Sequence, residues 1–205
     1  MPQNSLLLGL GRYFSEKELA ALASATVGIA GAGGLGSNAA LMLARCGVGG
    51  LRLIDCDVVD ASNLNRQQYW PADVGRPKVR ALADLLLRLN PELRLEAVQQ
   101  RISQQNAPGL LAGCPIWVEA LDDAAAKAML VEQALMLGLR CASASGMGGY
   151  GGEPMRKKRL GRLTLVGDYV TDIALAPPLA PRVTQAAAML ADAVLEFILG
   201  DGGRA

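Results

Sequence analysis

The sequence predicts an α/β fold in which one mainly parallel sheet carries helices on both faces of a single domain. Two observations predict this fold. Short apolar runs alternate along the chain with longer segments that carry apolar residues at helical spacing, the order expected of a parallel sheet covered by helices. The 205 residues are also 51% apolar and only 19% charged, so the chain can bury a core without disulfides or metals.

The boundaries of the elements follow from the apolar runs and from local stop signals. Strands are expected at residues 26–30, 51–55, 93–98, 116–119, 139–142 and 163–166. Helices are expected at residues 37–46, 78–89, 124–137 and 181–199. Gly47 and Gly200 are placed to end helices, Pro181 to open the last one, and Asp122 or Asp123 to cap the third. We expect a helical segment at residues 1–25, the main domain at 26–200 and a tail at 201–205.

Composition and charge exclude several classes of protein. The 20 basic and 19 acidic residues give a formal net charge of +1, which argues against a protein that coats nucleic acid. The chain has no histidine, which excludes histidine-dependent triads and histidine-ligated zinc. No stretch approaches the roughly 18 apolar residues of a membrane span, and the N-terminus lacks a signal-peptide pattern. We therefore expect a cytoplasmic protein that does not bind membranes.

A glycine motif, Gly31-Ala-Gly33-Gly-Leu-Gly36, directly follows the first expected strand and opens the first expected helix. Glycines at this spacing allow a tight turn, close approach of the backbone to a phosphate, and close helix packing. Asp55 lies 19 residues after Gly36, at the end of the next strand, where a carboxylate accepts from a ribose hydroxyl. The motif predicts a Rossmann-like nucleotide site, for which NAD(P) is the first interpretation.

The segment after the second strand favours ATP instead. Asp57, Asn63, Arg66 and Lys78 crowd the region where the nucleotide would lie. A dehydrogenase needs no such groups there, because its reactive atom is the distant nicotinamide carbon. An enzyme that cleaves between the α- and β-phosphates of ATP does need cations, since charge develops on the leaving pyrophosphate. A solvated loop with ordinary surface charges is the alternative.

These motifs resemble those of the ThiF/MoeB/HesA family, bacterial relatives of ubiquitin-activating enzymes. The resemblance rests on GAGGLGS at 31–37, LIDCDVVDASNLNRQ at 53–67 and GRPKV at 75–79. The segments 167–172 and 180–199 resemble the short ThiF-like branch assigned to thiamine biosynthesis. The resemblance implies that residues 26–200 form an adenylation domain that uses ATP and Mg²⁺. Its expected substrate is the C-terminal glycine of a ubiquitin-like sulfur carrier such as ThiS, and pyrophosphate is released.

The resemblance also implies roles for individual residues. Asp55 would hold the ribose, Asn63, Arg66 and Lys78 the phosphates, and Asp122 the Mg²⁺ ion, which proteins bind through one or two carboxylates and phosphate oxygens. Asp122 as a plain helix cap is the alternative. The expected nucleotide-binding residues are Gly31, Gly33, Gly34, Gly36, Asp55, Asp57, Asn63, Arg66 and Lys78. The expected catalytic residues are Arg66, Lys78 and Asp122, of which Asp122 is also the metal ligand.

The sequence departs from the family in two respects that concern cysteine. Longer relatives bind zinc with two CxxC pairs, whereas the cysteines here stand at 46, 56, 114 and 141, so we predict no zinc. Many relatives carry a reactive cysteine in a crossover loop, but residues 146–161 contain none. We therefore expect adenylation only, with sulfur delivered by a separate protein.

Three further expectations concern basic residues. The family implies a homodimer in which a second N-terminal arginine reaches the partner's ATP, but here Arg12 is kept and Ser15 stands at the second position. Residues 147–159, which end in four basic residues, are interpreted either as a flexible loop that closes over the carrier tail or as an exposed basic loop. Arg182 is a candidate for substrate contact.

Four alternative functions stay open at this stage. A molybdopterin-type carrier, or a small molecule or modified tRNA base, could be the group that is adenylated. An NAD-dependent oxidoreductase would use the same glycine motif for a different cofactor. A non-catalytic nucleotide-binding partner would agree with the missing loop cysteine and the missing second arginine.

Overall fold

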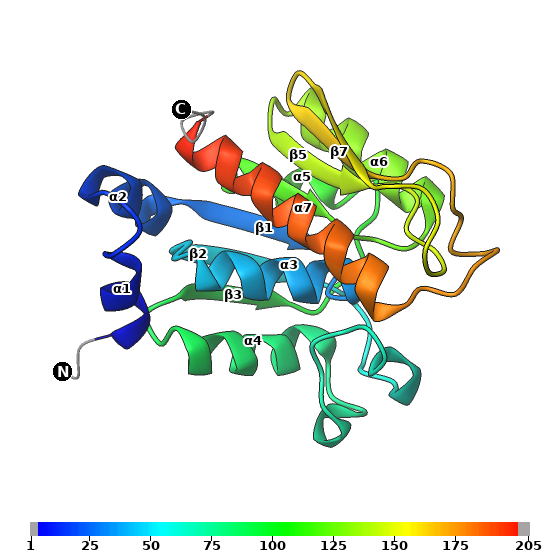
Figure 1. Ribbon diagram of the computed structural model, residues 1–205, viewed down its shortest axis with the longest axis horizontal. Coiled ribbons are helices and arrows are strands. Elements are labelled where there is room, and N and C mark those ends of the chain that lie inside the picture. Colours follow the sequence, from blue (N-terminus) through cyan, green and yellow to red (C-terminus); the bar gives the residue numbers. More distant parts are fainter. Residues whose placement is uncertain (1–3, 201–205) are drawn as a thin grey trace.

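The computed structural model describes residues 4–200 and contains one seven-stranded sheet in the order β3-β2-β1-β4-β5-β7-β6 (Figure 1). Six strands are parallel: β1 (Thr26–Ala30), β2 (Gly50–Ile54), β3 (Arg94–Val98), β4 (Ile116–Glu119), β5 (Arg140–Ala144) and β7 (Leu163–Gly167). Strand β6 (Arg156–Leu160) pairs antiparallel with β7 at one edge. The predicted mainly parallel α/β fold is confirmed, and each predicted strand is present within two residues of its expected bounds.

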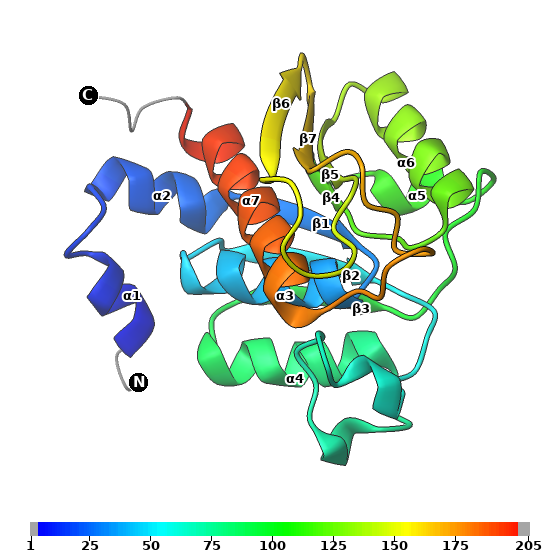
Figure 2. The same cartoon turned by 45° about the vertical axis from the view of Figure 1, so that its right-hand side comes forward.

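Helices cover both faces of the sheet, as the order of the elements predicts. On one face α3 (Gly34–Arg45) packs against α4 (Lys78–Leu89) and α7 (Ala180–Leu199), and on the other α5 (Ala107–Leu111) packs against α6 (Ala124–Met136) (Figures 1 and 2). Successive residues of β4 enter different cores: Ile116 and Val118 join the first face and Trp117 the second. Alternation of this kind is what a strand buried on both faces requires.

The segment before the sheet contains helices α1 (Ser5–Leu10) and α2 (Glu16–Ser24). Ser15 caps α2 in a capping box with Glu18, because each side chain accepts from the backbone N–H of the other. Both helices lie at the N-terminal ends of the strands, away from the loops that follow the strands' carboxyl ends (Figures 1 and 2). The predicted tail at 201–205 lies outside the described residues. Within residues 4–200, no helix combines the length and hydrophobicity needed to cross a membrane.

The expectation of a basic loop at 156–159 is wrong, because these residues form strand β6. Two residues, 161–162, connect β6 to β7, and Gly161 adopts the positive φ of +61° that so short a hairpin connection favours. Lys157 Nζ pairs with Asp192 (2.9 Å) and Glu196 (2.6 Å) of α7. All five residues of β6 are exposed, so the sequence carries no apolar alternation that would reveal the strand.

Candidate active site

A cleft of about 1250 Å³ lies at the carboxyl ends of β1, β2, β4 and β5. The chain order of the strands reverses between β1 and its neighbours β2 and β4, and ligands of open α/β sheets bind at such a switch point. The nucleotide residues that the sequence predicts are distributed along one wall, and Asp122 lies on the other. With the exception of Gly36, which packs behind the turn, all of the predicted site residues line this cleft.

The glycine turn between β1 and α3 forms part of the first wall. Gly31 has φ of +95°, a conformation that favours glycine. A Cβ on Gly36 would lie 1.8 Å from the carbonyl oxygen of Gly31, so the turn closes directly on the helix. Gly33 caps α3 without a side-chain hydrogen bond, which leaves amides of the first helical turn available to an anion.

Asp55 lies directly after β2 and is joined to the glycine turn. One carboxylate oxygen accepts from the N–H of Ala32 (2.6 Å) and the other from the N–H of Asp57 (2.7 Å). An ionised carboxylate has about four acceptor sites, so these two bonds fix Asp55 and leave acceptor sites for a ribose. The arrangement has the chemistry that the sequence assigned to this residue.

The two predicted cations of the first wall are held differently. Lys78 is buried and its Nζ lies 3.0 Å from Asp57; the hydrogen bond from Lys78 is the main reason that the pKa of the Asp57 carboxyl is lowered. Arg66 donates to the carbonyl of Ser62 (3.0 Å) and to Asn65 Oδ1 (2.7 Å). Both cations line the cleft, where they face the same space from neighbouring elements.

Asn63 contributes to the same wall through a short 3-10 helix, Ala61–Asn63. Its Oδ1 accepts from the N–H of Asp60 (3.0 Å). The amide group is therefore oriented by its own loop, and its nitrogen is the end that can donate to a phosphate.

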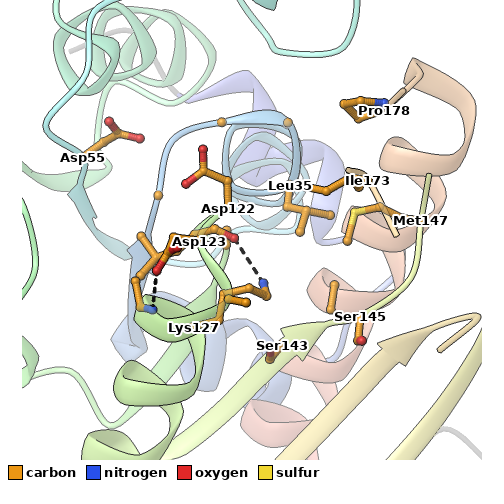
Figure 3. Close-up of a pocket in the computed structure, with 18 of the residues that line it drawn as sticks. Leu35, Asp55, Asp122, Asp123, Lys127, Ser143, Ser145, Met147, Ile173 and Pro178 are labelled. Carbon is orange, nitrogen blue, oxygen red and sulfur yellow. Dashed lines mark hydrogen bonds between the residues drawn. The ribbon is translucent and has the colours of Figure 1, made fainter. Parts of the chain in front are cut away.

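The two neighbouring acids after β4 divide two roles between them. Asp123 caps α6, since its Oδ1 accepts from the N–H of Ala126 (2.8 Å). Asp122 is exposed, and no hydrogen bond or ion pair with any other residue in 4–200 involves its carboxylate. Figure 3 shows Asp122 between Asp55 on one side and Leu35 on the other. The structure thus assigns the helix cap to Asp123 and leaves Asp122 available to a ligand.

Two loops, which precede β6 and follow β7, complete the second wall, and Arg182 of α7 is bonded to both of them. Asp168 is paired with Arg182 at the start of α7, and Arg182 also donates to the carbonyl of Gly151. Both charged residues are buried. Burial raises the pKa of Asp168, but hydrogen bonds from Thr171 and Val170 and the charge of Arg182 outweigh it and lower the pKa to about 2. Arg182 is therefore a structural residue, and the expectation of a substrate contact is wrong.

The cysteines show no activated thiol. Cys114 and Cys141 are buried, and Cys56 lines the cleft beside Asp55. Burial raises the pKa of all four thiols, that of Cys141 to about 12. Because the thiolate is the nucleophile, the environments disfavour cysteine chemistry at neutral pH.

Sequence reasoning missed one group that lines the cleft, Gln67, and one that lies behind it, Glu119. Gln67 is buried below the glycine turn, and its Oε1 is one of two buried side-chain polar atoms in residues 4–200 that have no hydrogen-bond partner. Glu119, at the end of β4, is completely buried and is paired with Lys127 of α6 (2.8 Å). An acid within a short buried strand was the available signal for the second group, because such an acid requires a partner.

The fold and the cleft define a Rossmann-like α/β protein whose site is built on a glycine turn and paired acidic and basic side chains. The model of the ThiF family matches residues 7–204. The chain therefore belongs to the ThiF family, and the resemblance predicted from the motifs is confirmed.

The chain is similar in sequence to several curated proteins. It is 40% identical over 127 residues to the "Adenylyltransferase and sulfurtransferase uba4" of Aspergillus terreus, covering 62% of this chain and 26% of that protein. It is 42% identical over 103 residues to the "SAMP-activating enzyme E1" of Haloferax volcanii, covering 50% of this chain and 38% of that protein. The "tRNA threonylcarbamoyladenosine dehydratase" of Escherichia coli is 37% identical over 125 residues, 60% of this chain and 47% of that protein. The matches thus span less than half of each of these three relatives.

A solved structure shares the whole fold. The E. coli tRNA N6-threonylcarbamoyladenosine dehydratase, solved in complex with ATP, superposes with a TM-score of 0.86 at 23% identity. The match covers 98% of this chain and 96% of that chain. This similarity confirms the single-domain Rossmann-like architecture.

Proposed function

We propose that this protein binds ATP in the cleft and adenylates the C-terminal glycine of a ubiquitin-like sulfur carrier of the ThiS type. The observation that carries the proposal is the convergence of two walls on one space. The first wall presents helix amides, Asp55, Arg66 and Lys78, and the second presents Asp122, whose carboxylate has no partner among residues 4–200. This set suits a nucleoside triphosphate, which carries a ribose, several phosphate charges and a bound cation.

The reaction needs position and charge stabilisation rather than proton transfer. A carboxylate oxygen of the carrier glycine forms a bond to the α-phosphorus, the bond from that phosphorus to the bridging oxygen breaks, and pyrophosphate leaves with the electron pair. The attacking carboxylate is ionised at neutral pH, so the reaction requires no general base and no histidine. Arg66 and Lys78 would stabilise the charge that develops on pyrophosphate, and Asn63 would donate to a phosphate oxygen.

Asp122 is the residue proposed to hold Mg²⁺. Its donor chemistry fits, because Mg²⁺ prefers oxygen ligands and is bound in nucleotide sites by one or two carboxylates together with phosphate oxygens. When bound, Mg²⁺ acts as a Lewis acid on phosphoryl oxygens. Asp57 is a weaker candidate, because its carboxylate is already paired with Lys78.

The surface of the second wall favours a protein tail as the second substrate. Apolar residues form much of this wall, among them Leu121, Val131, Met136, Val170 and Ile173. The charged residues that line the cleft are six acids and four bases, which is not the cationic excess that an RNA backbone requires. Relatives named as sulfurtransferases support a sulfur carrier, either ThiS-like or of the molybdopterin type. The raised thiol pKa values support adenylation without a cysteine step.

A second candidate follows from the relative named tRNA threonylcarbamoyladenosine dehydratase. Two findings favour that activity as the second candidate. The fold of that protein matches over nearly the whole of both chains, and its sequence is 37% identical over 60% of this chain. The same cleft would then bind ATP, with a modified tRNA as the second substrate. None of the relatives named above is called an oxidoreductase.

ATP–pyrophosphate exchange with purified components tests the proposal. We expect exchange that depends on a ThiS-like carrier, and losses of about 100-fold or more in Asp122→Asn and in Arg66→Ala, the scale for one charge-stabilising group. Asp192→Asn and Arg80→Ala, at exposed positions outside the cleft, are the matched controls and should retain exchange.

The same assay separates the alternatives. Exchange driven by a molybdopterin-type carrier or by threonylcarbamoyl-modified tRNA in place of the ThiS-like carrier would select those substrates. A nicotinamide absorbance change without any exchange would overturn the proposal.

A further inference from the structure

An ion pair between a buried acid, Glu119, and a partly exposed lysine, Lys127, lies behind the loop that carries Asp122. Glu119, with no exposed surface, makes three contacts: its Oε1 accepts from the N–H of Leu121 (2.7 Å), and its Oε2 accepts from the hydroxyl of Ser143 (2.5 Å) and pairs with Lys127 Nζ (2.8 Å). A buried carboxylate is destabilising unless its oxygens are fully hydrogen-bonded or paired. The fold therefore maintains a costly group at this point, and one of its three contacts holds the backbone N–H of Leu121.

Lys127 completes the connection from the other side. Its Nζ also donates to the carbonyl oxygen of Leu121 (3.1 Å), the bond that Figure 3 shows as a dashed line below Asp122. Both backbone polar groups of Leu121 are thus bound to the two ends of one ion pair. Ala120 is fixed as well, since its N–H donates to the carbonyl of Ala30 (2.8 Å).

The residues on both sides of Asp122 are consequently restrained. Leu121 precedes it and is held by the ion pair, and Asp123 follows it and caps α6. The side chain of Asp122 itself has no hydrogen-bond or ion-pair partner within residues 4–200. A backbone held this firmly under an unpartnered carboxylate is the arrangement expected of a ligand that must be pre-positioned.

We propose that Glu119 and Lys127 are positioning residues, which orient the loop so that the Asp122 carboxylate meets the cation bound with the nucleotide. The inference rests on the function proposed above and adds to it two residues that act through the backbone of the Asp122 loop. Partners that orient a metal ligand typically change metal affinity 10–100-fold when they are removed. A role confined to folding would instead lower stability and leave metal affinity unchanged.

The experiment measures Mn²⁺ dependence of nucleotide binding, without turnover. Binding of α,β-methylene ATP is followed by calorimetry at increasing Mn²⁺, and the readout is the Mn²⁺ concentration that gives half of the metal-dependent gain in affinity. The test variant is Glu119→Gln combined with Lys127→Met, which removes both charges together and avoids an uncompensated buried ion. Lys158→Met, at an exposed position on β6, is the matched control.

For the double variant we expect a 10–100-fold increase in this Mn²⁺ concentration, with nucleotide affinity in the absence of metal unchanged. Lys127→Arg should keep the wild-type value, because a guanidinium can still bridge the acid and the Leu121 carbonyl. If the double variant does not fold, Glu119→Gln alone is measured, and it should raise the Mn²⁺ concentration because an amide cannot accept from all three donors.

The outcomes separate the two proposals. Wild-type Mn²⁺ dependence in the folded double variant, or in Glu119→Gln, overturns the positioning role. If Asp122→Asn loses its Mn²⁺ dependence in the same experiment, the proposed function stands. Wild-type Mn²⁺ dependence in Asp122→Asn itself would instead overturn the metal assignment in the proposed function.

Discussion

The two walls of the cleft are built in different ways. The first wall comes from residues 31–78, and its polar groups are held by bonds to neighbouring backbone, as with Asp55 and the glycine turn. The second wall comes from residues 120–178 and is held by ion pairs of buried acids between separate elements, Glu119 with Lys127 and Asp168 with Arg182. Contacts between residues that are close in the sequence give a recognisable motif, whereas ion pairs between residues of separate elements do not.

This contrast implies different responses to substitution. A change in the glycine turn should disturb binding and folding together, because the same backbone serves both. A change in a distant ion pair of the second wall should lower stability first. A change on the exposed edge strand β6 should have little effect on either ligand binding or stability.

The largest effect is expected for Gly36→Ala. The added Cβ would lie 1.8 Å from the Gly31 carbonyl oxygen and 2.9 Å from its carbon, and backbone atoms cannot move aside as a flexible side chain can. We expect a loss of about 3 kcal/mol in the free energy of unfolding, the upper range for overpacking, together with weaker ATP binding. Urea unfolding and calorimetry measure the two quantities.

Gly109→Ala is the matched control for this substitution. Gly109 lies in α5, and a Cβ there has no heavy atom within 4 Å. The control should be neutral or slightly stabilising, since alanine is the better helix former. Equal stability of Gly36→Ala and the control would contradict the close contact in the turn.

An intermediate effect is expected for Asp168→Asn. The pKa of Asp168 falls from 3.8 to about 2 in the folded protein, so its ionised form contributes stability that is complete above the unfolded value and is lost as pH falls through about 2. We expect the variant to be about 2 kcal/mol less stable near neutral pH. The difference from wild type should shrink as the pH is lowered below 3.8.

Urea unfolding over a series of pH values measures this dependence, with Asp192→Asn on the surface of α7 as the control. A difference that did not change with pH would show that the charge of Asp168 is not what holds the loop. ATP affinity near that of wild type is expected, because Asp168 does not line the cleft.

The smallest effect is expected for Lys157→Ala. Its two ion pairs with α7 are partly exposed, Lys157 itself retaining 25% of its side-chain surface, and such pairs contribute about 0.5 kcal/mol. We expect the free energy of unfolding, measured in urea, to fall by that amount. Amide hydrogen exchange should still show protection in β7, its hydrogen-bonded neighbour. Loss of that protection would mean that the pair, rather than strand pairing, holds the edge of the sheet.

The sequence predicted most of the fold, together with residues that the structure brings together along one wall of the cleft. The alternation of strands and helices, the glycine motif and Asp55 are local patterns, and local patterns can be read without coordinates. Strand β6 could not be predicted, because its exposed basic residues have no alternation and its existence depends on pairing with β7. Arg182 was misassigned because a lone arginine at the start of a helix does not reveal a buried partner 14 residues earlier.

The acids after β4 show the limit most clearly. Two adjacent aspartates gave no means of deciding which one caps the helix, and only the hydrogen bond from Ala126 to Asp123 decides it. Glu119 could have been flagged as an acid in a buried strand, but its partner Lys127 is one of many lysines and arginines in the chain. Which side chains of different helices and strands pair with one another cannot be predicted from the order of residues alone.

The closeness of Gly31 and Gly36 has a consequence for kinetics. A turn so tightly closed offers an arriving phosphate amides that already share one direction, so little chain entropy is lost in the encounter. Association of the nucleotide under the proposed function should then approach the speed of simple docking, and the proposal leaves discrimination among second substrates to the opposite wall.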